Sequence, residues 1–237
     1  MTISEDFDIV VAGGGVAGLA AAAAFGSAGY RTLCIDPAVP VTDRDAQGAD
    51  LRTPAFLQPA RDFLDRIGLW SRVAGEAQNL QVMRIVDAGG ETPHPRLTRD
   101  FDSADISERP FGWNVPNWLL RREFAAALAE MDSVDHRQGR AATGIFTRSG
   151  EARVRLDDGT QVGARLAVAA DGRNSTLRRA ANIGVRTFRY GQKALAFAVT
   201  HNAPHDNVST EIHRSGGPFT LVPLPDRDGK PCSAVVW

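Results

Sequence analysis

The feature of this sequence that most constrains its fold is a glycine turn near the beginning. Residues 13–18 read G-G-G-V-A-G, which contains the pattern G-x-G-x-x-G. A β-branched and aromatic run, 7–11, precedes this turn, and an alanine-rich helical stretch, 19–28, follows it. A second apolar run, 31–35, then leads to Asp36. A strand, a glycine turn, a helix and a second strand in this order predict one βαβ unit.

Each glycine of the turn has a physical reason to be there. Gly13 permits a tight turn, Gly15 lets a diphosphate approach the backbone without meeting a Cβ atom, and Gly18 lets the helix pack closely on the strand. Unpaired N–H groups and the helix dipole favour an anion at the start of the helix. The predicted dinucleotide-contacting residues of the turn are Gly13, Gly15, Val16, Ala17 and Gly18.

Asp36 stands at the end of the second predicted strand. A carboxylate in this place accepts hydrogen bonds from the hydroxyl groups of an adenosine ribose. It also repels a 2′-phosphate, which favours FAD or NAD over NADP at this site. The motif alone does not decide between FAD and NAD.

Composition excludes several classes of function. The 237 residues carry a net charge of −1, and acids and bases are interspersed. Such a chain offers no basic surface for nucleic acid and no polybasic membrane anchor. Its longest apolar run is too short to span a bilayer, and no signal peptide is recognisable, so we expect a cytoplasmic protein. The cysteines and histidines lack metal-ligand spacing, and we expect no metal site.

Arginines precede or open two predicted helices. Arg52 comes just before a helix expected to begin at Thr53 with Pro54 in its first turn and to end at Gly68. The pattern leaves open whether Arg52 is a functional residue or a solvated surface residue.

A second helix is expected to start at Asn117, with Arg121 and Arg122 in its first turn. Cations at a helix start oppose the helix dipole, so at least one of the two arginines is expected to meet an anion. The alternative is that they pair with Glu123 or another surface acid.

Strands are expected at 80–86 and near 111–115, with a loop over the rest of 92–117. Trp113 and Trp118, in and after that region, could line a ligand cleft or could pack in the core.

Short strands broken by glycines are expected from 134 to 163, with breaks at Gly139 and Gly144. The pair Asp158-Gly159 predicts a hairpin with arms 153–156 and 161–164.

A separate apolar strand, 165–170, is expected to run into Asp171 and Gly172, just before a basic helix that begins at Thr176. An acid and a glycine at the carboxyl end of a strand lie where open α/β sheets hold ligands. Asp171 and Gly172 are therefore a second candidate edge of the cofactor site, with a plain turn as the alternative.

The pattern changes from alternating strands and helices to strands alone after Gly191, which suggests a second subdomain built on a sheet. We therefore predict an α/β fold. A Rossmann-like, dinucleotide-binding domain comprises 1–79 and 117–183, and an interleaved β-sheet subdomain for substrate comprises 80–116 and 184–237.

Five motifs occur in one order along the chain. They are the glycine turn at 13–18, R-T-P-A-F-L-Q at 52–58, N-W-L-L-R at 117–121, A-D-G-R-N-S at 170–175 and G-P…P-L-P at 217–225. Together they resemble the FAD-dependent aromatic hydroxylases, or class A flavoprotein monooxygenases, and most closely those of ubiquinone biosynthesis. The resemblance extends over essentially the whole chain.

The resemblance implies roles for particular residues. The glycine turn would bind the FAD diphosphate, Asp36 the adenosine ribose, and Arg52 and Arg121 the phosphate and ribose portion. Asp171 and Gly172, in the family's Asp-Gly motif, would contact an FAD ribose and help to engage NAD(P)H, the expected electron donor. The resemblance identifies no catalytic side chain.

The implied activity is a monooxygenase reaction. FAD that the electron donor has reduced would react with molecular oxygen to form a C4a-hydroperoxyflavin, which hydroxylates an aromatic ring, here a polyprenyl-phenol intermediate of ubiquinone biosynthesis. The alternatives are another small phenol as substrate, or a non-catalytic scaffold that keeps the flavin fold. A prenylated substrate implies transient contact with the inner membrane or with a biosynthetic complex.

The sequence departs from the family pattern in one respect. Members of the family have a later Gly-Asp motif that binds FAD, and this motif has no counterpart in this sequence. The resemblance therefore implies a chain truncated at its C-terminus, with an incomplete substrate subdomain. We expect such a chain to bind FAD weakly and to turn over poorly.

Overall fold

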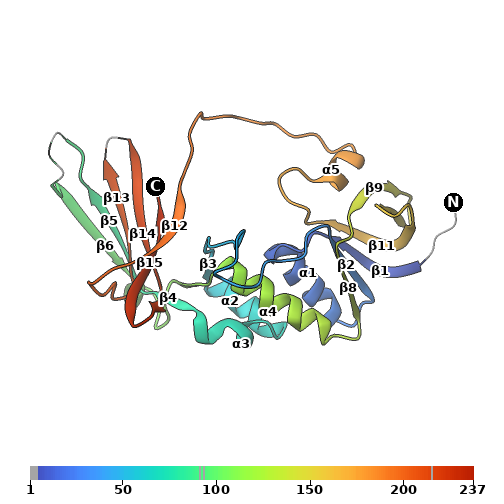
Figure 1. Ribbon diagram of the computed structural model, residues 1–237, viewed down its shortest axis with the longest axis horizontal. Coiled ribbons are helices and arrows are strands. Elements are labelled where there is room, and N and C mark those ends of the chain that lie inside the picture. Colours follow the sequence, from blue (N-terminus) through green and yellow to red (C-terminus); the bar gives the residue numbers. More distant parts are fainter. Residues whose placement is uncertain (1–4, 91, 93, 215) are drawn as a thin grey trace. The chain divides into compact units, whose positions relative to one another are not determined.

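Figure 1 shows the computed structural model, which describes residues 5–90, 92, 94–214 and 216–237. The chain divides into two compact units, Met1–Gly48 with Leu120–Phe188, and Ala49–Leu119 with Arg189–Trp237. The sequence predicts that 49–79 belong to the first domain, whereas in the structure these residues belong to the second unit. The reason is pairing, because the strand Ala55–Leu57 joins a sheet whose other members come from the second unit.

The first unit is built on a six-stranded sheet with the order β8-β2-β1-β11-β10-β9. Neighbours among the strands β8, β2, β1 and β11 are parallel, and β10 and β9 extend the sheet as antiparallel strands. The strands are β1 (Glu5–Ala12), β2 (Thr32–Asp36), β8 (Val134–Gln138), β9 (Ala142–Thr147), β10 (Ala152–Leu156) and β11 (Gln161–Ala169). The helices are α1 (Val16–Ser27), α4 (Asn117–Ala129), which begins in the second unit, and α5 (Thr176–Ala180).

The predicted βαβ unit is confirmed as β1, α1 and β2. Val10 and Val11 in β1 and Leu33 in β2 are fully buried. Continuous apolar runs of this kind are typical of parallel strands that are covered on both faces. The glycine turn between β1 and α1 therefore lies on a rigid support.

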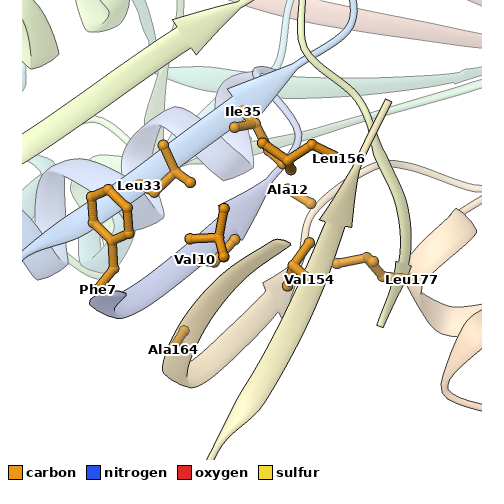
Figure 2. Packing of buried hydrophobic residues seen from close by; sticks show 10 residues of the cluster. Phe7, Val10, Ala12, Leu33, Ile35, Val154, Leu156, Ala164 and Leu177 are labelled. Atoms are coloured by element: carbon orange, nitrogen blue, oxygen red, sulfur yellow. The ribbon is translucent and has the colours of Figure 1, made fainter. Parts of the chain in front are cut away.

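Figure 2 shows side chains from five elements of the first unit meeting in one core. Phe7 and Val10 of β1 pack with residues of β2, β10 and β11 and with Leu177 of α5. Full burial of an aliphatic side chain of this size contributes about 1.5–3 kcal/mol. The contact with Leu177 fixes α5 to the sheet.

Two predicted breaks in this region are wrong. Gly144 lies within β9, although the pairing with β10 shifts in register beside it, between Arg155 and Leu156. The expected strands 161–164 and 165–170 form the single strand β11. β11 is continuous because β1 pairs with it from Glu5 opposite Val162 to Ala12 opposite Ala169. The hairpin turn at Asp158-Gly159 and the strand arms beside it are confirmed.

The second unit contains a six-stranded sheet with the order β12-β15-β14-β13-β5-β6 and a three-stranded sheet with the order β3-β7-β4. The first consists of β5 (Val82–Asp87), β6 (Leu97–Asp102), β12 (Ala196–Thr200), β13 (Val208–Arg214), β14 (Gly217–Arg227) and β15 (Lys230–Val236). The second consists of β3 (Ala55–Leu57), β4 (Gln78–Leu80) and β7 (Gly112–Asn114). The helices are α2 (Gln58–Arg66), α3 (Trp70–Val73) and the short 3-10 turns η1 (Ala74–Glu76) and η2 (Ser103–Asp105). The predicted change to strands alone near the end of the chain is confirmed.

The helix expected to begin at Thr53 starts later. Ala55–Leu57 form β3, which pairs with β7, and α2 begins at Gln58 with Pro59 in its first turn. Pro59, and not Pro54, is therefore the proline at the helix start. The prediction was wrong because the partner strand of β3 is more than fifty residues away and gives no local signal.

The strand β6 lies in a stretch that the sequence analysis treats as a loop. It pairs with β5, but its residues are exposed except Asp102, so the alternation that marks a half-buried strand is absent. The expected short strand near 111–115 is β7. Within the described part of the chain, every helix is too short or too polar to cross a membrane.

Candidate functional site

The candidate site lies at the carboxyl ends of β1 and β11, which are neighbouring parallel strands. β1 continues through α1 to β2 on one side, whereas β11 lies on its other side, so the strand order reverses between them. Open α/β sheets bind ligands at such a switch point. The N–H of Ala170 donates to the carbonyl oxygen of Ala12 at 2.8 Å, which brings the two following turns together.

Three glycines of the turn are required by contacts within the chain. A Cβ atom at Gly13, where φ is +120°, would collide with the carbonyl oxygen of Ala170. A Cβ at Gly14 would lie 2.7 Å from the Cβ of Asp36, and one at Gly18 would collide with the carbonyl oxygen of Gly13. Packing within the fold therefore explains these three positions.

Gly15 is not explained in this way. Its backbone has φ −74° and ψ 171°, which any residue adopts. Among the described residues, no atom would lie within 4 Å of a Cβ atom there. The position opens onto free space at the start of α1, as it must if a ligand approaches the backbone there.

The start of α1 also leaves its N–H groups free for a ligand. Gly15 caps this 12-residue helix without a side chain, and the first turn contains no acidic residue. The first N–H groups of a helix have no partner within it, and they carry the positive end of the helix dipole. Val16, Ala17 and Gly18 thus present donors suited to a phosphate group.

Asp36 reaches back to the glycine turn. One carboxylate oxygen accepts a hydrogen bond from the N–H of Gly14, and the other accepts one from the N–H of Ala38 at 2.7 Å. The residue is half-buried. Because each carboxylate oxygen has more than one acceptor site, Asp36 can still accept from ribose hydroxyl groups. No local sequence pattern predicts the contact with Gly14, which is 22 residues away.

Asp171 follows β11 and has one oxygen in use and one free. Oδ2 accepts hydrogen bonds from the N–H groups of Thr176 at 2.7 Å and Leu177 at 3.2 Å. Oδ1 is buried and has no partner among the described residues. Burial alone would raise the pKa of Asp171, but hydrogen bonds from the Ser175 side chain, Leu177 and Thr176 outweigh it and lower the pKa. A charged acceptor is thus left for a ligand.

Beside it, Gly172 has φ +85°, and a Cβ atom there would meet no atom of the chain within 4 Å. This backbone conformation favours glycine at the turn.

The two arginines of α4 differ in their surroundings. Arg122 pairs with Glu123 at 2.8 Å, as the alternative prediction allowed. The Nε of Arg121 is buried and has no hydrogen-bond partner in the described part of the chain. A buried donor without a partner costs about 1–3 kcal/mol, so this group is suited to an anion that none of the described residues provides.

Arg52 lies in the second unit and pairs with a carboxylate. Its Nε and Nη2 donate to Asp50 at 2.8 and 2.6 Å. Asp50 also accepts from Nδ2 of Asn117 at 3.1 Å. The hydrogen bond from Arg52 is the main cause that lowers the pKa of Asp50. The spacing D-x-R was a signal for this pair that the sequence analysis did not use, and the role of Arg52 toward FAD stays a prediction.

A largely apolar pocket of about 530 Å³ lies in the second unit, on the sheet formed by β5, β13 and β14. It is lined by Val86, Ala88, Ile212, Phe219 and Trp237, among others, and by Arg214. A volume in this range is typical of small-molecule sites. Trp113, which the sequence analysis considered for a cleft, instead packs edge-to-face on Trp70 at 5.6 Å.

A larger hollow of about 620 Å³ in the first unit includes Asp8, Phe25 and Tyr30 in its lining. None of the residues of the glycine turn or of the Asp171 turn lines it. This hollow is therefore distinct from the candidate site at the carboxyl ends of β1 and β11.

Comparison with known proteins identifies similar chains. Ubiquinone hydroxylase UbiL of Rhodospirillum rubrum is 33% identical over 230 residues, which cover 97% of this chain and 51% of that protein. The 3-demethoxyubiquinol 3-hydroxylase of Escherichia coli is 26% identical over 236 residues, which cover 99% of this chain and 58% of that protein. The chain thus spans about half the length of the curated relatives it matches. The resemblance to ubiquinone-biosynthesis hydroxylases is confirmed.

Solved structures share the fold. PqsL of Pseudomonas aeruginosa, in complex with 2-aminobenzoylacetate, matches with a TM-score of 0.79 at 21% identity, over 98% of this chain and 60% of that one. The p-nitrophenol 4-monooxygenase PnpA of Pseudomonas putida matches with a TM-score of 0.78 at 19% identity, over 98% of this chain and 58% of that one.

The sequence profile described as "FAD binding domain" matches residues 6–230, which is nearly the whole chain. This match agrees with a glycine turn that is open at Gly15 and with an uncapped start of α1. The chain belongs to the FAD binding domain family.

Proposed function

We propose that this chain binds FAD and serves in a monooxygenase that hydroxylates an aromatic ring, with NAD(P)H as the electron donor. The proposed substrate is a polyprenyl phenol of ubiquinone biosynthesis. The observation that carries the proposal is the open space at Gly15, because packing within the fold explains the other three glycines of the turn and leaves this one unexplained. The names of the relatives in ubiquinone biosynthesis support the choice of substrate.

The residues of the first unit fit the cofactor. The FAD diphosphate would be held by Gly15 and the N–H groups at the start of α1, and an adenosine ribose by Asp36. Oδ1 of Asp171 and Nε of Arg121 are buried and have no partner among the described residues. We propose that these two atoms complete the FAD site, as acceptor and donor respectively.

A bound flavin supplies the electron transfer and oxygen activation that ring hydroxylation needs. The task of the chain is to orient the ring and to keep water away from the reacting groups. The pocket beside β5, β13 and β14 supports this task, since Phe219 and Trp237 offer apolar surface to a ring or to an isoprenoid chain. Arg214 adds a cation that would favour a phenolate.

A polyprenyl substrate partitions into membranes, so its enzyme must collect it from a bilayer or from another protein. We therefore propose that the chain works at the cytoplasmic side of the inner membrane, in transient contact with the lipid or with other biosynthetic proteins. Flotation with vesicles that contain a prenylated phenol tests this contact. Equal flotation with vesicles that lack the phenol would argue against recruitment by substrate.

Substitution of Gly15 tests the FAD site. Gly15→Val would place a side chain in the open space while leaving the fold intact, and we expect FAD affinity to fall at least 100-fold in a fluorescence titration. Gly144→Val is the matched control, because a Cβ there also meets no atom within 4 Å and Gly144 lies in β9, away from the turn. Equal affinity of wild type and Gly15→Val would overturn the proposed site.

The visible spectrum and product analysis test the activity. A purified chain that takes up FAD shows flavin absorbance, and one that stays colourless with excess FAD would favour a non-catalytic scaffold. The chain is incubated with NADH or NADPH and oxygen, once with a prenylated phenol and once with a simple phenol. We expect a hydroxylated product from the prenylated phenol. Hydroxylation of the simple phenol alone would retain the chemistry and reject the proposed substrate.

A further inference from the structure

We propose that Ser175 is a positioning residue, which holds the carboxylate of Asp171 so that its free oxygen faces a ligand hydroxyl group. Ser175 touches no reacting group in this proposal and acts through Asp171. The inference rests on the proposed function, since it concerns the same FAD site. The observation that carries it is that two side chains of one short loop, Asp171 and Ser175, both cap the start of α5.

Ser175 closes the loop that links β11 to α5. It is 4% exposed, and its Oγ accepts a hydrogen bond from the N–H of Arg178 at 3.0 Å. Its own N–H donates to the carbonyl oxygen of Gly172 at 3.0 Å. These two bonds fix where α5 begins, because an N-cap residue sets the direction of the first helical turn.

The start of α5 in turn fixes Asp171. The N–H groups of Thr176 and Leu177, the first two residues of the helix, both donate to Oδ2. Leu177 is 2% exposed and packs in the core of the first unit, so α5 cannot shift freely. The carboxylate is therefore held from one side, while Oδ1 stays buried and without a partner among the described residues.

α1 and α5 use their first N–H groups in different ways. The N–H groups at the start of α1 meet no capping side chain, which leaves them for an anionic ligand. Those at the start of α5 are taken by Asp171 and Ser175. The start of α5 thus holds the carboxylate of Asp171 in place, and a carboxylate suits a hydroxyl donor rather than a phosphate.

The charge of Asp171 agrees with this role. Burial opposes ionisation, but the hydrogen bonds from Ser175, Leu177 and Thr176 lower the pKa of Asp171. The charged side chains of the same loop and helix are Arg173, Arg178 and Arg179. The neighbouring glycine turn has no charged residue of its own, but its Gly14 N–H donates to the carboxylate of Asp36. An ionised carboxylate with a free oxygen accepts strongly from a ribose hydroxyl.

A purely structural cap is the competing interpretation. In that case Ser175→Ala would lower stability, as N-cap substitutions do, and would change neither the titration of Asp171 nor the binding of FAD. Thr160→Ala is the matched control, because the Thr160 hydroxyl donates to Asp158 at 2.6 Å in a hairpin turn of the same unit. Each variant removes one hydroxyl group that makes a hydrogen bond in a turn, but only Ser175 caps the helix that holds Asp171.

The first measurement needs no flavin. The pKa of Asp171 is followed by carboxyl ¹³C NMR in the wild-type chain and in Ser175→Ala, Ser175→Thr and Thr160→Ala. We expect Ser175→Ala to raise the pKa of Asp171, Ser175→Thr to restore it, and Thr160→Ala to leave it unchanged. An unchanged pKa in a folded Ser175→Ala overturns the positioning role.

The second measurement is FAD affinity in a double-mutant cycle. Ser175→Ala should weaken FAD binding about 10-fold in the wild-type background and should have no further effect in Asp171→Asn, because both changes act on one contact. Additive losses would overturn the proposal. If the wild-type chain fails to bind FAD while the NMR result holds, the proposed function is wrong, and Asp171 is positioned for another hydroxyl ligand.

Discussion

Asp36 accepts a hydrogen bond from the backbone N–H of Gly14, 22 residues earlier in the chain, and so ties the end of β2 to the glycine turn. A Cβ atom at Gly14 would lie 2.7 Å from the Cβ of Asp36, so the contact also requires glycine. The carboxylate that is expected to bind a ribose therefore also holds the turn that is expected to bind the diphosphate. This hydrogen bond therefore couples the two halves of the proposed FAD site.

Asp36→Ala should consequently weaken both FAD binding and the fold. Loss of hydrogen bonds to a charged acceptor costs about 1–3 kcal/mol, and we expect a loss of this size in FAD affinity together with a lower free energy of unfolding. Calorimetry and urea denaturation measure the two effects. Asp43→Ala is the control, since Asp43 caps a neighbouring loop by accepting from the N–H of Asp45 at 2.9 Å. Similar FAD affinities in both variants would contradict the role of Asp36.

Substitution by alanine should lower the stability of the fold at Gly18 and leave it unchanged at Gly15. A methyl group at Gly18 would collide with the carbonyl oxygen of Gly13, whereas one at Gly15 meets no atom within 4 Å. Overpacking of this kind costs about 1–3 kcal/mol or more, so Gly18→Ala should unfold at a clearly lower urea concentration. Gly15→Ala should keep the stability of the wild type. Equal stability of the two variants would show that α1 is not packed on the turn as the structure has it.

Much of the first unit could be predicted from the sequence because its signals are local. The run before Gly13, the helix after it and Asp36 lie within about thirty residues, and buried parallel strands leave continuous apolar runs. The second unit was harder. Ala55–Leu57 become a strand only because β7 pairs with them, and β6 lacks alternation because it is exposed.

The residues of the candidate site could also be predicted only in part from the sequence. Motifs pointed to the glycine turn and to Asp171, but not to Ser175 as a cap of α5. Arg121 and Arg122 are neighbours of the same type, and their pattern alone gave no reason to distinguish them, although the family resemblance pointed to Arg121. Tertiary packing does so, since it buries the Nε of Arg121 and leaves Arg122 beside Glu123.

The two arginines of α4 should therefore differ in their effect on FAD. Arg121→Met removes a buried donor without a partner, so we expect no loss of stability without flavin and an FAD affinity at least 10-fold weaker. Arg122→Met removes a surface pair with Glu123, and such pairs contribute about 0–1 kcal/mol. Thermal unfolding with and without FAD measures both effects. An Arg121 variant that FAD still stabilises as strongly as the wild type would rule out this arginine as a ligand.

Cys34 is the middle residue of β2 and lies beneath the glycine turn. It is fully buried, and its Sγ is 3.9 Å from the carbonyl oxygen of Gly13. Burial, with a smaller contribution from the charge of Asp36, raises the pKa of the Cys34 thiol from 9.0 to about 12. Because the thiolate is the reactive form, we expect Cys34 to resist thiol reagents in the folded chain.

The same shift predicts how stability depends on alkaline pH. Between 9.0 and about 12 the folded chain keeps the Cys34 proton that the unfolded chain has lost, so the folded state binds more protons and the free energy of unfolding falls as pH rises. The contribution of the neutral thiol is complete below pH 9.0 and is lost above it by up to about 1.4 kcal/mol per pH unit. Urea denaturation of wild type and Cys34→Ala, below and above this pH, measures the effect. Other alkaline groups titrate in both proteins, so the difference between them isolates Cys34. A difference that does not change with pH would mean that the thiol ionises as easily in the folded chain as in the unfolded one, and that water reaches the strand beneath the glycine turn.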